Sequence, residues 1–174
     1  MFDKDTLNRF YRYCLSLTHA PDTAYDLLQS SLEKVLRRQK ARQDRCDELP
    51  PLGYLYAIAR NAFIDGQRHR TRFPSEPLDE ETTGGGAVSS VGFSALEDLM
   101  LDRSTVVSLM SQLEASEREL LYLWAVEGYT IQEIAEHMHT PRGTLLSRLH
   151  RLRARIQRAI APAFDTPRLK EVAS

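Results

Sequence analysis

The chain has 174 residues, of which 42% are hydrophobic and 27% charged, and its formal net charge is −1. This composition predicts one ordinary globular domain or two small ones, and it excludes fibrous and wholly disordered chains. No run approaches the ~18 consecutive apolar residues of a membrane span, and the acidic N-terminus is unlike a secretory signal. Cys14 and Cys46 form no CxxC pair. We therefore expect a cytoplasmic protein with reduced thiols and no metal, the alternative being a redox or metal role for the two cysteines.

The near-neutral total conceals a strong segregation of charge. Residues 141–160 contain six arginines and no acid, whereas residues 73–102 contain seven acids and no lysine or arginine. Residues 60–72 carry four arginines against one acid, Asp65. Charge sorted in this way indicates separate surfaces for separate partners.

In the N-terminal half, apolar residues recur at helical spacing, and no stretch shows the alternation of a β-strand. Apolar residues mark one helix over about residues 7–17. A second begins at Pro21 and Asp22 and keeps its apolar stripe as far as Leu36. Residues 37–51 break the pattern and are predicted to form a loop. A third helix is predicted from about Leu52 to Arg70.

Residues 73–93 hold two prolines and four glycines, a composition that predicts a flexible tether. Helical periodicity resumes at Leu96. The chain is therefore predicted to be all-α. We expect two helical domains, over residues 1–72 and 96–162, with a linker over 73–95 and a tail over 163–174.

Local signals divide the C-terminal half further. Two capping boxes, each a Ser or Thr followed three residues later by Glu, are predicted at Ser116…Glu119 and Thr130…Glu133. The first opens a helix that stops at Gly128, and the second opens a short helix. Thr140 with Pro141 then begins the last helix, because proline is well tolerated in a first turn.

On a helical wheel, the last helix has one apolar face and one cationic face. The apolar face comprises Leu145, Leu149, Leu152, Ile156 and Ile160. Ser147, Arg151 and Arg158 lie opposite, with Arg148 and Arg155 on one shoulder and Leu146 and His150 on the other. A short helix, a tight turn and a longer helix with an arginine-rich outer face predict a helix-turn-helix that binds DNA.

An ordinary amphipathic helix with a solvated basic face is the alternative. Such helices usually mix charges of both signs, which this one does not. The histidines at 137, 139 and 150 are predicted to be surface or phosphate-facing groups rather than metal ligands.

The stretch "EGYTIQEIAEHMHTPRGTLLSRLHRLRARI" resembles the promoter-reading C-terminal domain of extracytoplasmic-function (ECF) sigma factors, in the sigma-70 family of bacterial RNA polymerase. The matching positions are Pro141, Gly143, Thr144, Ser147, Arg148, Leu149, Arg151 and Arg153. "YLYAIARNAFIDGQRHR" resembles that family's helix that meets the minus-10 element. "TAYDLLQSSLEKVLR" resembles the helix that docks on the polymerase clamp. Three motifs in order cover most of residues 5–160.

The resemblance implies a sigma factor without catalytic residues or cofactor. Its implied partners are core RNA polymerase, through the beta-prime clamp and beta flap, promoter DNA and an anti-sigma factor, without membrane insertion. The implied minus-35 contacts are Arg142, Thr144, Leu146, Ser147, Arg148, His150, Arg151 and Arg155. Those to the minus-10 element are Arg60, Asn61, Asp65, Arg68 and Arg70. The implied clamp contacts are Asp26, Gln29 and Glu33.

Three positions depart from the family pattern. Tyr54 stands where tryptophan is usual, and Leu32 where phenylalanine is usual. Leu146 replaces an arginine of the recognition helix, which removes one hydrogen-bond donor from the DNA face.

Two other functions compete with the sigma-factor reading. A stand-alone helix-turn-helix regulator, whose N-terminal half dimerises or senses a ligand, would bind DNA without polymerase. An enzyme is disfavoured, because the sequence has no GxGxxG, P-loop, HExxH or nucleophile elbow.

Overall fold

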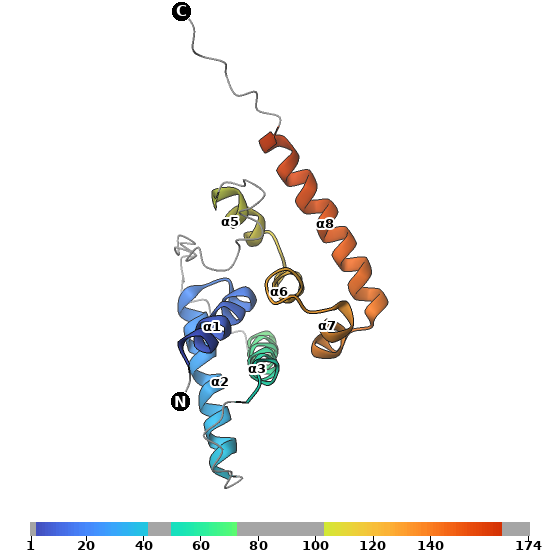
Figure 1. The fold of residues 1–174 in the computed structure, drawn as a ribbon. Helices are drawn as coiled ribbons and strands as arrows, with labels where there is room; N and C mark the ends of the chain where they lie inside the picture. The colour runs from blue at the N-terminus through green and yellow to red at the C-terminus, as the bar shows by residue number, and fades with distance from the viewer. Residues whose placement is uncertain (1–2, 42–49, 73–102, 165–174) are drawn as a thin grey trace, which may run out of the picture. The chain divides into compact units, whose positions relative to one another are not determined.

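The computed structural model describes residues 3–41, 50–72 and 103–164, and every regular element in these ranges is an α-helix (Figure 1). The all-α prediction is confirmed. The chain divides into two compact units, residues 1–92 and 93–174. The predicted linker lies outside the described residues, as does the predicted tail from residue 165 onwards. None of the described helices combines the length and the hydropathy that crossing a membrane requires.

Unit 1 is built from three helices that pack against one another in every pairing, α1 (Lys4–Thr18), α2 (Pro21–Ala41) and α3 (Leu52–Arg72). Asp3 caps the start of α1, where its carboxylate accepts the backbone N–H groups of Asp5 and Thr6 at 2.7 and 3.1 Å. His19 ends the helix in the left-handed conformation, with φ 59°.

An aromatic stack joins α1 to α3 in the core of unit 1. The ring centroids of Tyr13 and Tyr56 lie 4.2 Å apart, and Phe10 stacks on Tyr56 at 6.2 Å. All three side chains are fully buried, as is Cys14 beside them in the sequence. Burial raises the pKa of the Cys14 thiol well above its usual range, which makes this cysteine an inert core residue.

The second helix differs from its prediction at its C-terminal end. Residues 37–41 continue α2 instead of beginning the loop, because arginine, glutamine, lysine and alanine all favour helix. Leu36, predicted on the apolar stripe, is 48% exposed. Ser31 is buried instead, and its hydroxyl donates to the Leu27 carbonyl at 2.6 Å, which satisfies its polar group within the helix.

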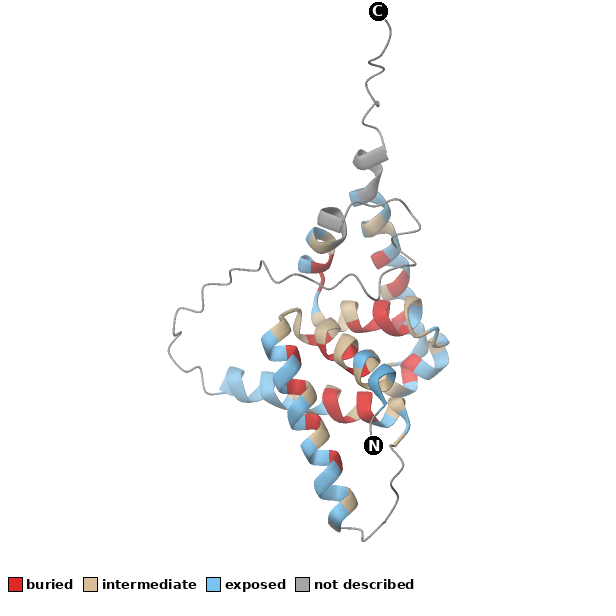
Figure 2. Ribbon diagram, turned by 60° about the vertical axis from the view of Figure 1, so that its left-hand side comes forward, coloured by how far each residue is buried: buried red, intermediate tan, exposed pale blue. Residues whose placement is uncertain are grey.

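Unit 2 comprises α5 (Arg103–Ser111), α6 (Ala115–Ala125), α7 (Ile131–Met138) and α8 (Arg142–Phe164). Helices α5, α6 and α7 each contact α8, which is the long element of the unit. The buried residues of α8 recur along one side, whereas five consecutive residues of α6, Glu119–Leu123, are buried (Figure 2 colours the ribbon by burial). One core cluster contains Met110, Leu113, Leu121 and Leu152.

The predicted capping box at Ser116 and Glu119 is wrong. Helix α6 begins at Ala115, its N-cap is Glu114, and the Glu117 carboxylate accepts the Glu114 backbone N–H at 3.1 Å. Glu119 is buried, whereas a capping role would hold it at the surface.

The box at Thr130 and Glu133 is confirmed. The Thr130 backbone N–H donates to the Glu133 carboxylate at 2.7 Å, and the Glu133 N–H donates to the Thr130 hydroxyl at 3.3 Å. Helix α6 ends at Ala125, slightly before the predicted stop. Gly128 lies beyond that end with φ +72°, and the Tyr129 N–H returns to the Leu123 carbonyl at 2.9 Å.

Candidate nucleic-acid interface and partner surface

The turn between α7 and α8 consists of three residues held by backbone hydrogen bonds. His139 adopts the left-handed conformation, with φ 50° and ψ 44°. The Thr140 N–H donates to the Ala135 carbonyl at 3.0 Å, and the His139 N–H to Glu136 at 3.3 Å. These are the two bonds of a Schellman motif, and they define the direction in which α8 leaves α7. The predicted helix-turn-helix is present.

Leucines fix α8 in the unit, as the wheel predicts. Leu145, Leu149 and Leu152 are all buried, and Ile156 is half-buried. The side chain of Ile160 lies outside the described residues. Because this face is committed to packing, the opposite side of the N-terminal half of α8 is open to a partner.

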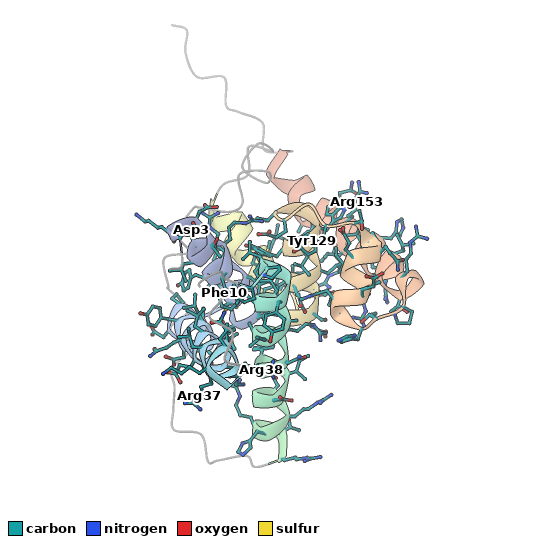
Figure 3. All side chains as sticks on the ribbon, turned by 60° about the horizontal axis from the view of Figure 1, so that its bottom comes forward. Asp3, Phe10, Arg37, Arg38, Tyr129 and Arg153 are labelled. Carbon is teal, nitrogen blue, oxygen red and sulfur yellow. The ribbon has the colours of Figure 1, made fainter. Side chains whose placement is uncertain are left out.

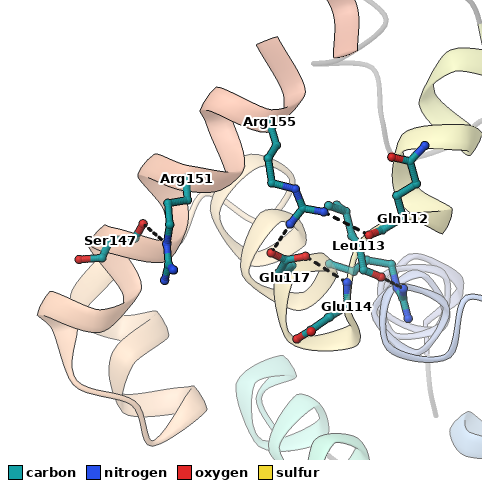
Figure 4. A network of polar contacts seen from close by, with 8 residues as sticks. Gln112, Leu113, Glu114, Glu117, Ser147, Arg151 and Arg155 are labelled. Carbon is teal, nitrogen blue, oxygen red and sulfur yellow. Dashed lines mark hydrogen bonds and ion pairs between the residues drawn. The ribbon is translucent and has the colours of Figure 1, made fainter. Parts of the chain in front are cut away.

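The open surface bears most of the residues predicted to meet the minus-35 element. Of these, Arg148 is half-buried, while Arg142, Thr144, Leu146, Ser147, His150 and Arg151 are exposed. Ser147 donates its hydroxyl to the Gly143 carbonyl at 3.0 Å, and Arg151 donates from Nε to the Ser147 carbonyl at 3.3 Å (Figure 4). Arg151 is therefore held along the helix with the rest of its guanidinium still available.

Arg155, the remaining predicted minus-35 residue, has other partners. One guanidinium nitrogen lies 2.7 Å from the Glu117 carboxylate and another donates to the Gln112 carbonyl at 3.2 Å (Figure 4). Arg118 donates to the Leu113 carbonyl at the same junction. The structure thus places Arg155 at the junction of α5 and α6, which sequence spacing alone did not indicate.

Arg153 contacts α6 from the other shoulder of α8. Its guanidinium carbon lies 5.9 Å from the centroid of the Trp124 ring, a cation–π geometry, and Figure 3 labels the arginine on the helix. On a wheel, Arg153 and Arg155 flank the leucine face. The two arginines therefore hold α8 against α6 from both sides.

His137 lies inside unit 2, so its prediction as a surface group is wrong. Its Nε2 lies 3.3 Å from the Glu119 carboxylate, and both side chains are almost fully buried. Buried polar side chains need a hydrogen-bonding partner, and here each group supplies one to the other. The pair therefore links α7 to α6. His139 and His150 are exposed, as expected. Among the described residues, no three His, Cys, Asp or Glu side chains cluster as metal ligands would.

The predicted minus-10 residues all lie on α3, but not on one face. Arg60 is half-buried, whereas Asn61, Asp65, Arg68 and Arg70 are exposed. Asn61, Asp65 and Arg68 follow helical i, i+4 and i+7 spacing and share a stripe, with Arg60 and Arg70 off it.

The predicted clamp residues, Asp26, Gln29 and Glu33, are all exposed on α2. They share that helix with the exposed apolar groups Tyr25 and Leu36, and Glu33 pairs with Arg37 at 3.5 Å. Tyr25 and Leu36 were not predicted to belong to this surface, and the hydrophobic pattern assigned Leu36 to the core.

Near the C-terminal end of the same helix, Arg38 donates to the Tyr54 hydroxyl at 3.2 Å, which joins the end of α2 to the start of α3. Figure 3 labels Arg38 and its neighbour Arg37. Tyr54 is itself 39% exposed. The pair therefore presents an aromatic ring beside a cation at the edge of unit 1.

Comparison with known proteins identifies what unit 2 is similar to. Residues 103–156, from the start of α5 into α8, match the family model "Sigma-70, region 4". A solved structure, that of the sigma factor RpoE from Bartonella quintana in complex with the anti-sigma factor NepR, resembles the chain with a TM-score of 0.61. It is 23% identical and the match covers 90% of this chain and 92% of that one, which is a likeness of fold.

Sequence relatives extend the match across both units. The ECF RNA polymerase sigma factor SigL of Mycobacterium tuberculosis is 27% identical over 140 residues, 80% of this chain and 76% of SigL. SigE of Mycolicibacterium smegmatis is 29% identical over 154 residues, 88% of this chain and 58% of SigE. The RNA polymerase sigma-H factor of Pseudomonas aeruginosa is 32% identical over 118 residues, 63% of this chain and 60% of that protein. Over both units, the chain is therefore similar to ECF sigma factors, and residues 103–156 match region 4 of the sigma-70 family.

Proposed function

We propose that the chain binds core RNA polymerase and directs it to promoters by recognising a minus-10 and a minus-35 element. The observation that carries this function is the helix-turn-helix of unit 2. There, leucines anchor α8 while the exposed side of its N-terminal half presents two arginines, Arg142 and Arg151, and no acid. A helix of this kind fits the major groove, where arginine can bind phosphate or a guanine edge.

In this function, unit 2 binds the minus-35 element as duplex. Ser147, His150 and Arg151 face the bases, together with Leu146. Arg142, Thr144 and Arg148 lie at the edge of the surface, where they can contact phosphates. Arg155 contributes to DNA binding indirectly, by holding α8 in place, because its guanidinium already bonds to Glu117 and Gln112.

Unit 1 contacts polymerase and the minus-10 element. The Asp26, Gln29 and Glu33 side chains give α2 a polar surface for the clamp. Asn61, Asp65, Arg68 and their neighbours Arg60 and Arg70 on α3 meet the minus-10 strand. Each unit alone would bind DNA weakly, but two tethered contacts bind strongly when polymerase holds both at the right spacing.

The proposed partners are therefore core polymerase, through its beta-prime clamp and beta flap, and promoter DNA, all in the cytoplasm. An anti-sigma factor is a further proposed partner, and the NepR complex of the similar Bartonella quintana protein supports it. Recruitment of polymerase needs no catalytic residue or cofactor in this chain.

Run-off transcription with core polymerase from the same organism tests the function. Asp26→Ala with Gln29→Ala should abolish most promoter-dependent transcript, because the clamp contact is lost. Lys34→Ala is the control, since Lys34 is exposed on α2 but stands at neither i, i+3 nor i, i+4 spacing from Asp26 or Gln29. Specific DNA binding that never requires core polymerase would instead favour a stand-alone regulator.

A further inference from the structure

We propose that Leu146 recognises the 5-methyl group of a thymine in the minus-35 element. Leu146 is the fifth residue of α8 and its side chain is 43% exposed. One turn before it on the helix stands Arg142 and one turn after it stands His150, both exposed, and Ser147 is its neighbour. It is thus an apolar side chain in the middle of a polar, cationic surface.

The position of this leucine distinguishes it from a surface residue of no consequence. Single exposed apolar residues are common on proteins. The neighbouring leucines Leu145 and Leu149, however, are buried, so α8 already has a complete packing face without Leu146. In helix-turn-helix proteins, the N-terminal residues of the second helix are the ones that reach base edges. Leu146 lies in that part of α8.

The chemistry of leucine selects the base. Leucine has no hydrogen-bond donor or acceptor, and the major groove offers one strongly apolar feature, the thymine methyl. A guanine or cytosine against Leu146 would lose water from its polar edge without gaining a partner, which is unfavourable. Arginine at the same position would favour guanine, through its N7 and O6 acceptors. Leu146 should therefore make one column of the minus-35 element a thymine.

Because this inference rests on the proposed function, the experiment has two stages. In the first, holoenzyme made from the full chain and core polymerase selects duplexes from a library randomised across the minus-35 window. Failure to select any sequence would overturn the proposed function and this inference with it. A selected minus-35 element with no thymine in either strand would overturn the inference alone.

In the second stage, each thymine of the selected element is replaced singly by deoxyuridine, which removes only the methyl group. At one position the holoenzyme should lose about fourfold in affinity, the effect of leaving one methyl-sized apolar group unburied. Leu146→Ala should bind the thymine and deoxyuridine duplexes equally. Gln157→Ala, exposed on the same shoulder of α8 but nearer its C-terminus, should keep the methyl dependence.

The converse substitution gives an independent readout. Leu146→Arg, put through the same selection, should replace thymine by guanine in the affected column and leave the other columns unchanged. Wild-type holoenzyme that binds every deoxyuridine duplex as tightly as the parent would overturn the inference, as would methyl dependence that persists in Leu146→Ala.

Discussion

Arg155 and Glu117 form an ion pair of 2.7 Å that joins α8 to the first turn of α6, across 38 residues of sequence. The same guanidinium donates to the Gln112 carbonyl just beyond α5, so one side chain links three helices. A planar guanidinium with two fixed acceptors is well ordered. We therefore expect Arg155 to act as a positioning residue, which holds α8 against α6 and the end of α5.

This relationship predicts a coupled effect of the two residues. Arg155→Ala and Glu117→Gln should each destabilise unit 2, and the double-mutant cycle should give a coupling of about 0.5–1 kcal/mol, since the pair is partly exposed. Urea unfolding followed by the fluorescence of Trp124, the one tryptophan of the chain, measures this unit specifically.

The salt dependence of promoter binding then separates positioning from phosphate contact. A residue that neutralises one phosphate lowers the slope of log affinity against log salt by about 1 when it is removed. Arg142→Ala should do so, whereas Arg155→Ala should weaken binding with the slope unchanged. A reduced slope for Arg155→Ala, with no coupling to Glu117, would show that this arginine contacts DNA instead.

The buried pair of Glu119 and His137 gives a second prediction. Glu119→Leu alone leaves the His137 ring without this acceptor inside the unit, and should cost about 1–3 kcal/mol of unfolding free energy. Adding His137→Leu should recover part of that loss, because two leucines can pack against each other better than a leucine packs against an imidazole. A double variant as unstable as the sum of the two single ones would argue against a direct interaction.

The features that the sequence predicted well are those that depend on nearby residues. The Thr130–Glu133 box, the turn before Pro141 and the leucine face of α8 all follow from spacings within a few positions. The misjudged residues have partners that are distant in the chain. Arg155 pairs with Glu117, and His137 pairs with Glu119. A helical wheel shows one helix only, so it cannot predict contacts between helices. Tertiary pairing also removes Glu119 from the predicted capping box, because its carboxylate lies buried beside His137.

Two left-handed residues of unit 2 should respond oppositely to substitution. His139 and Gly128 both have positive φ, at 50° and 72°. A non-glycine residue in that region costs about 1–2 kcal/mol, partly offset by the greater freedom that glycine has in the unfolded chain. His139→Gly should therefore raise stability by about 0.5–1 kcal/mol.

Gly128→Ala is the matched counterpart and should lower stability by about 1 kcal/mol or more, although open space surrounds the position. Thermal unfolding monitored by Trp124 fluorescence compares both variants with wild type. Stabilisation by Gly128→Ala would show that this turn relaxes to another conformation when glycine is absent.

Cys14 should resist thiol reagents in the folded protein. The thiol is fully buried, and its pKa is raised by that burial, so little thiolate exists to react. In a Cys46→Ser background, labelling of Cys14 by iodoacetamide should appear only as urea unfolds unit 1. Rapid labelling in buffer alone would mean that α1 opens readily from α2 and α3.

Glu133 should make the stability of the helix-turn-helix fall in acid. Hydrogen bonds from the Thr130 hydroxyl and then its backbone N–H hold the pKa of this carboxyl below its ordinary value of 4.5. A lowered folded-state pKa stabilises the fold fully above the unfolded value, and this contribution disappears as pH falls through the folded value. Between pH 5 and pH 3, wild type should therefore lose more stability than Glu133→Gln, and the two should converge in acid.

The Thr130 hydroxyl supplies the control for this pH effect. In a Thr130→Ala background the largest cause of the shift is gone, so the difference between Glu133 and Glu133→Gln should depend much less on pH. Urea unfolding of the four proteins at several pH values, followed through Trp124, completes the comparison. An equal pH dependence in both backgrounds would assign the acid sensitivity of unit 2 to other carboxyls, and the box would then serve only as a geometric cap.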